Sequence, residues 1–75
     1  MIRENIRSDD SEGFVVVVSV RQKQEQTRRV LHYREHIART IEIARQKAAR
    51  MDEKWTAKTN GMQGIAVNVL IANDT

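Results

Sequence analysis

The feature that most constrains this chain is a series of apolar residues spaced alternately four and three apart between positions 37 and 55. Its members are Ile37, Ile41, Ala44, Ala48, Met51 and Trp55. This spacing is typical of one face of an α-helix, and no proline or glycine interrupts it. We therefore predict one long helix that begins at Gln22 or Thr27, with Thr27 as a candidate cap, and ends at Thr59, before Asn60-Gly61.

A strand is expected on each side of this helix. Residues 14–20 are almost entirely β-branched, and every second residue of 65–72 is β-branched, which places Ile65, Val67, Val69 and Ile71 on one face. The order strand, helix, strand indicates a right-handed crossover between parallel strands. The predicted fold class is α+β, a single β-α-β unit with one long helix and two strands, completed by homo-oligomerisation.

The first thirteen residues are polar apart from two isolated isoleucines, Ile2 and Ile6, and Val or Phe appear only after Gly13. We expect residues 1–13 to form a flexible N-terminal arm and residues 14–75 to form the single oligomerising domain. The isoleucines could dock the arm on a partner subunit, but a frayed arm is the more usual behaviour of a chain end and is favoured here.

Two arguments predict self-association. A helix from residue 27 to 59 would be about 50 Å long, whereas a globule of 75 residues is only about 30 Å across. Two strands also do not make a stable sheet in water, and the face without a helix would expose Val15, Val17, Ala66 and Leu70. The apolar face of the helix could pack either on a second copy or on the sheet of its own chain, and the sequence supports both interpretations equally. The expected interface consists of Val15, Val17, Ile37, Ile41, Ala44, Ala48, Met51, Trp55 and Leu70.

Basic residues collect on one flank of the predicted helix. The net charge is +3, from 13 basic and 10 acidic residues. The candidate nucleic-acid contacts on this flank are Arg29, Lys47, Arg50 and Lys54, although an ordinary solvated helix face is favoured because Asp52 and Glu53 lie nearby and aromatic residues are few. His32 and His36 are four apart, a spacing that metal sites use, but their neighbours are basic, so a solvated pair is favoured over a metal or pH-sensing role.

No pattern in the sequence indicates catalysis. No serine lies near a histidine in the sequence, no glycine-rich phosphate loop precedes a helix, and there is no cysteine. We expect a non-enzymatic protein without metal or cofactor that binds itself, as a dimer, and an unidentified protein partner through its long helix. Nucleic-acid binding by the basic flank is the alternative. Without an apolar run long enough to span a bilayer, a cytoplasmic location and no membrane partner are expected.

Overall fold

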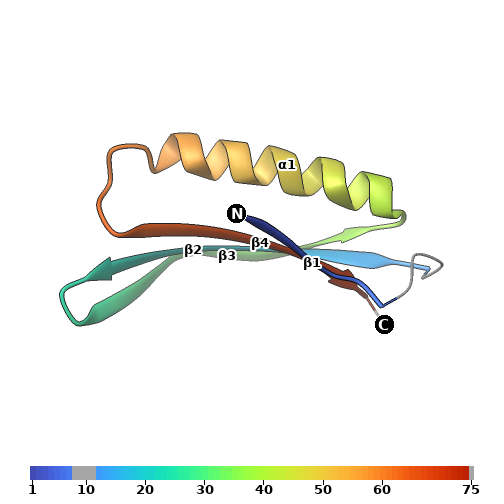
Figure 1. Cartoon of the computed structure of the whole chain (residues 1–75), viewed down its shortest axis with the longest axis horizontal. Helices are drawn as coiled ribbons and strands as arrows, with labels where there is room; N and C mark the ends of the chain where they lie inside the picture. The colour runs from blue at the N-terminus through green and yellow to red at the C-terminus, as the bar shows by residue number, and fades with distance from the viewer. Residues whose placement is uncertain (8–11, 75) are drawn as a thin grey trace.

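The computed structural model describes residues 1–7 and 12–74, and it lays one helix across one side of a β-sheet (Figure 1). The elements follow in the order β1 (Ile2–Asn5), β2 (Phe14–Gln24), β3 (Thr27–Ala38), α1 (Ile41–Lys58) and β4 (Ile65–Asn73). The chain is α+β, but with four strands, so the prediction of a two-stranded β-α-β unit is wrong.

The four strands form one mixed sheet in the order β1-β4-β2-β3. β2 pairs antiparallel with β3 on one side and with β4 on the other, while β1 pairs parallel with the outer side of β4. The two strands predicted from the sequence, β2 and β4, are therefore neighbours, but they are antiparallel rather than parallel. α1 connects β3 to β4, which run in the same direction with β2 between them.

The core lies between α1 and the two central strands. Every second residue of β2 from Phe14 to Val20 is buried, and β4 contributes Val69 and Ile71. The helix faces them with Ile41, Ala44 and Ala48, and the two alanines are fully buried. Because alanine has a short side chain, the helix backbone can approach the sheet closely at these two positions.

The helix begins later than predicted. Its N-cap is Thr40, whose hydroxyl accepts a hydrogen bond from the backbone N–H of Ile43 at 3.2 Å. Its end agrees with the prediction, because Thr59 caps the last turn through Trp55 and Gly61 then takes a positive φ of 89°. The helix has 18 residues and is about 27 Å long, which is shorter than the 43 Å long dimension of the molecule.

Residues 27–38 account for the missing half of the helix. They form β3, which pairs with β2 along its whole length through a tight turn at Glu25, whose φ is 54°. Thr27 therefore starts a strand and does not cap a helix. The pairing register shifts between Val20 and Arg21, and this bulge lets Leu31 stand out of the alternation.

The chain also has a strand where an arm was expected. Residues 2–5 form β1 at the outer edge of β4, and Ile6 packs against the core cluster. Residues 8–11, the rest of the predicted arm, lie outside the described residues. Within the described part of the chain, no helix has the length and apolarity needed to cross a membrane.

Candidate functional site

A strip of basic side chains runs along the gap between α1 and the edge strand β3. We call this surface the basic strip. On the helix-facing side of β3 lie Arg29 and Arg34, and on the adjoining flank of α1 lie lysines and one arginine one to three turns apart. The members of the basic strip are Arg29, Arg34, Lys47, Arg50, Lys54 and Lys58.

The helical repeat separates the charges of α1 onto two flanks. With Ala48 facing the sheet, Lys47 and Lys54 fall on the side toward β3, and Asp52 falls on the side toward β1. Contacts agree with this division, because Lys47 Nζ donates to the carbonyl oxygen of Ile37 in β3 at 2.8 Å. On the other flank, Asp52 lies 3.0 Å from the amino group of Met1. Arg50 lies further round, toward solvent.

The β3 half of the strip is set by the pairing register. His32, Arg34 and His36 are opposite Val20, Val18 and Val16, whose side chains point to the helix. Residues directly opposite each other in a sheet share a face. The two histidines and Arg34 therefore lie on the side of the sheet that α1 covers. The helix packs mainly on β2 and β4, so this side of β3 stays partly uncovered.

One ring contact joins α1 to β3, and a second lies within α1. The rings of His32 and Trp55 stack with their centroids 4.3 Å apart, and the Lys58 ammonium lies 4.9 Å from the centroid of the Trp55 ring. Such contacts stabilise the ring in a fixed orientation. Trp55 is therefore already engaged by the protein and does not offer a free platform on which a nucleic-acid base could stack.

No carboxylate belongs to the basic strip among the described residues. Glu35 lies on the opposite face of β3, and Glu4 of β1 forms a two-point ion pair with Arg45 at 2.9 and 3.0 Å. The hydrogen bond from Arg45 holds the pKa of the Glu4 carboxyl below its usual value. The β1 flank of the helix thus carries charges of both signs, joined in ion pairs, whereas the members of the basic strip are all cations.

His36 lies among these cations. Its Nε2 is shielded from solvent and has no hydrogen-bond partner among the described residues. Desolvation lowers the pKa of His36, and the positive charges of Arg34, Lys47, His32 and Lys54 lower it further. The imidazole is therefore held in its neutral form over a wider pH range than a free histidine.

The two histidines do not form a metal site. Because they lie on a strand, four residues apart, their Cα atoms are about 13 Å from each other, and a common ion needs ligands about 2 Å from its centre. In the described ranges, no group of three or more histidine, aspartate or glutamate side chains could hold a metal ion.

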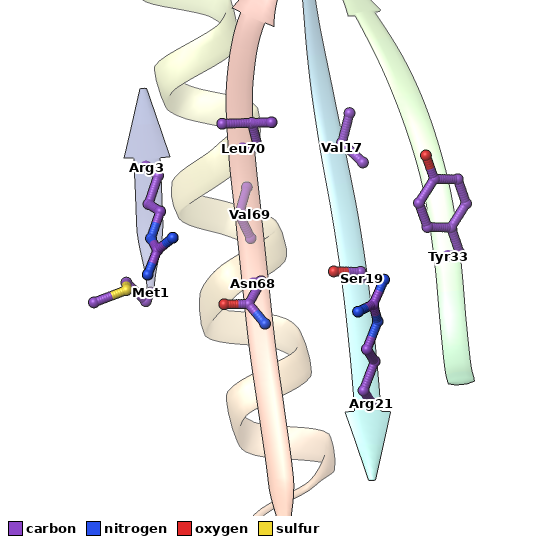
Figure 2. Close-up of a pocket in the computed structure, with 9 residues that line it drawn as sticks. All are labelled: Met1, Arg3, Val17, Ser19, Arg21, Tyr33, Asn68, Val69 and Leu70. Atoms are coloured by element: carbon purple, nitrogen blue, oxygen red, sulfur yellow. The ribbon is translucent and has the colours of Figure 1, made fainter. Parts of the chain in front are cut away.

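The other side of the sheet carries no helix, and we call it the open face. Figure 2 views it with α1 behind, and shows Leu70, Val17 and Tyr33 side by side on three neighbouring strands. A shallow depression of about 410 Å³ lies here, and Arg3, Arg21, Ser19 and Asn68 add polar groups to its lining. Ile37 and Leu70 are 58% and 36% exposed on this face.

The structure divides the residues predicted for an oligomer interface into two groups. Val15, Val17, Ile37 and Leu70 share the open face, as does Ala66. The others lie on α1 and turn toward the sheet of their own chain: Ile41, Ala44 and Ala48 are buried, and Met51 and Trp55 pack against the core. The helix residues are thus covered within one chain.

All four predicted nucleic-acid contacts, Arg29, Lys47, Arg50 and Lys54, belong to the basic strip, although Arg29 comes from β3 and not from the helix. Arg34 and Lys58 also belong to the strip but were not predicted from the sequence. Arg34 could be found only by recognising β3, since strand alternation places it between His32 and His36 on one face. Lys58 follows Lys54 by four residues and could have been found from the helical repeat alone.

Comparison of the chain with protein-family models, with curated proteins and with solved structures gives no match.

Proposed function

We propose that this protein binds nucleic acid through contacts between phosphates and the basic strip. The observation that carries the proposal is a surface of six cations, none of which forms an ion pair with another described residue. The whole chain, in contrast, has a net charge of only +3. A surface of one sign attracts a polyanion and gains affinity by releasing its counterions.

The contacts of the strip predict how specific this binding is. Lysine and arginine side chains that meet phosphates position a protein on nucleic acid but do not read its sequence. The aromatic ring at the strip, Trp55, is stacked against His32. We therefore propose binding with little sequence preference.

The length of the strip sets the number of phosphates. Lys47 and Lys58 are eleven residues apart on α1 and span about 17 Å along its axis. One strand of a duplex presents a phosphate about every 3.4 Å, so about three to five phosphates would face the strip. The logarithm of the binding constant should then fall with the logarithm of salt concentration with a slope of about −2.7 to −4.5 for a duplex.

The prediction that a protein partner binds the long helix assumed that this helix spans residues 27–59 and projects from the sheet. The observed helix has 18 residues and turns its apolar side to its own sheet. Nucleic-acid binding does not depend on that helix length, because the basic strip combines α1 with β3.

The test is a titration of fluorescently labelled duplex and single-stranded oligonucleotides with the protein, read by anisotropy at several salt concentrations between about 50 and 200 mM. The double variant Lys54→Gln/Lys58→Gln should weaken binding to every sequence and make the salt slope shallower by about two. Lys23→Gln is the matched control, since Lys23 is exposed on the open face.

Two results would overturn the proposal. One is the lack of salt-dependent binding by the unaltered protein at the lowest salt concentration. The other is an equal loss of affinity in Lys23→Gln and in the Lys54→Gln and Lys58→Gln single variants, because binding would then follow total charge and not the strip.

A further inference from the structure

Two opposite charges stand at matching positions on the two edges of the open face. Arg3 of β1 is opposite Leu70 of β4, Leu70 is opposite Val17 of β2, and Val17 is opposite Glu35 of β3. These four residues form one row across the sheet. Arg3 and Glu35 are thus equally far from the line that runs between the two central strands.

Neither charge is paired with another residue of the described ranges 1–7 and 12–74. No ion pair joins Arg3 or Glu35 to another described residue. They cannot pair with each other, because three strand spacings of about 4.8 Å put their backbones about 14 Å apart. Between them the row is apolar, with Leu70 36% exposed.

We infer that the open face packs against the open face of a second copy of this chain, around a two-fold axis that runs parallel to the strands between β4 and β2. This rotation exchanges the two edges of the sheet and keeps every row in place. Arg3 then lies opposite Glu35 of the second copy, and Glu35 lies opposite its Arg3. The two unpaired charges of each chain become two intermolecular ion pairs.

The same axis also matches the centre of the open face. On β2 and β4, in the rows of Val15, Val17 and Ser19, it sets apolar side chains on apolar ones and polar side chains on polar ones, whereas at the edges Ile37 comes opposite Asn5 of the second copy. The pairs between the copies are Leu70 with Val17, Ala72 with Val15, and Asn68 with Ser19. The side chains of the second copy would also occupy the depression seen in Figure 2.

The charges distinguish this arrangement from the other face-to-face dimer. A two-fold axis perpendicular to the strands through the Arg3 row would bring Arg3 onto Arg3 and Glu35 onto Glu35, and opposed like charges are strongly unfavourable. An axis parallel to the strands also keeps the strand directions of the two sheets aligned, as in sandwiches whose sheets pack within about 30° of each other.

This dimer leaves the basic strip free. The strip lies on the helix side of the sheet, so the two strips of the dimer would be on its outer surfaces. Self-association is therefore measured without nucleic acid, and its outcome does not depend on whether the strip binds phosphates.

The test is sedimentation of the unaltered chain and of charge-reversed variants over a concentration series. The unaltered chain should reach twice its mass of 8.7 kDa. Arg3→Glu and Glu35→Arg should each weaken dimerisation by about tenfold or more, because each puts two like charges together twice per dimer. The double variant Arg3→Glu/Glu35→Arg should restore the dimer.

Glu53→Arg is the control, because it makes the same change of charge on the exposed side of α1 and should leave the dimer intact. Circular dichroism checks that each variant is folded. If a reversal unfolds the chain, Arg3→Gln and Glu35→Gln replace it, and each should still weaken the dimer. The inference fails if the unaltered chain stays monomeric, if neither single change weakens the dimer, or if the double reversal does not restore it.

Discussion

His32 and Trp55 stack across the boundary between β3 and α1, with 4.3 Å between their ring centroids. Along this boundary the helix leaves the edge strand partly uncovered, and the stack helps to hold the two walls of the basic strip at a fixed distance. Lys47 makes a further contact through its hydrogen bond to Ile37. The geometry of the candidate site therefore depends on residues that belong to both elements.

This stack predicts an energetic coupling between His32 and Trp55. In a double-mutant cycle with His32→Ala, Trp55→Ala and the double variant, we expect a coupling of about 0.5 to 1.5 kcal/mol in the free energy of unfolding, the usual size for a ring pair. Urea unfolding followed by circular dichroism measures it, since Trp55 is the only tryptophan and its fluorescence is lost in two of the variants. Additive effects would mean that the rings do not stabilise each other.

Two isoleucines near the start of α1 should differ in how much their substitution lowers the stability of the protein. Ile41 is 9% exposed in the core, whereas Ile43 is 39% exposed on the flank toward β3. Ile41→Ala should lower the free energy of unfolding by about 2 to 5 kcal/mol. Ile43→Ala should cost less than about 1 kcal/mol. Equal losses in a denaturant titration would mean that the helix is rotated relative to the sheet.

The sequence predicts the elements that carry a clear apolar period. Residues 14–20 and 65–72 do lie in strands, and the helical spacing from Ile41 to Trp55 does lie in α1. The same spacing extends backward through Ile37, Tyr33 and Val30, and this extension produced the error. These three residues instead lie on the open face of β3, where strand alternation and a bulge at Leu31 imitate a helical repeat.

The edge strands explain why the rest could not be predicted. β3 has mainly arginine and histidine on its helix-facing side, and on its other face Glu35 stands between Tyr33 and Ile37. The apolar alternation that indicates a strand is therefore interrupted. β1 is only four residues long and gains its place by pairing with β4, which is distant in the sequence. The basic strip depends on β3 in turn, so the sequence indicated Arg29, Lys47, Arg50 and Lys54 but not Arg34, and Lys58 was not predicted either.

In the turn between α1 and β4, two glycines should differ in the loss of stability that their substitution by alanine causes. Gly61 and Gly64 both have positive φ, 89° and 72°, but a Cβ at Gly61 would meet nothing, whereas one at Gly64 would collide with the carbonyl oxygen of Lys23. Gly61→Ala should cost about 1 to 2 kcal/mol for its backbone conformation alone. Gly64→Ala should lower the free energy of unfolding by at least about 1 kcal/mol more than Gly61→Ala. The added Cβ also disrupts the hydrogen bond that the Lys23 N–H donates to the carbonyl oxygen of Gly64 at 2.9 Å.

The glycine comparison is made by chemical denaturation of both variants beside the unaltered chain. Similar small losses would show that the turn can move away from the end of β2. A larger loss in Gly61→Ala would contradict the geometry of the turn.

The last prediction concerns His36, whose pKa is lowered by desolvation and by the cations around it. A free histidine has a pKa of about 6.5, so below that pH the unfolded chain takes up a proton that the folded chain resists. The neutral His36 should therefore contribute fully to the free energy of unfolding above about pH 6.5. This contribution should fall as the pH is lowered toward the pKa of the folded state.

Urea unfolding at several pH values between about 5 and 7.5, read by Trp55 fluorescence, measures this slope. His36→Gln should make the slope shallower because it removes the group that titrates differently in the two states. His32→Gln keeps His36 and should retain most of the dependence. If the unaltered chain and His36→Gln lose stability in parallel, the buried Nε2 of His36 does not control the pH response, and the charge cluster around it must be more solvated than its geometry indicates.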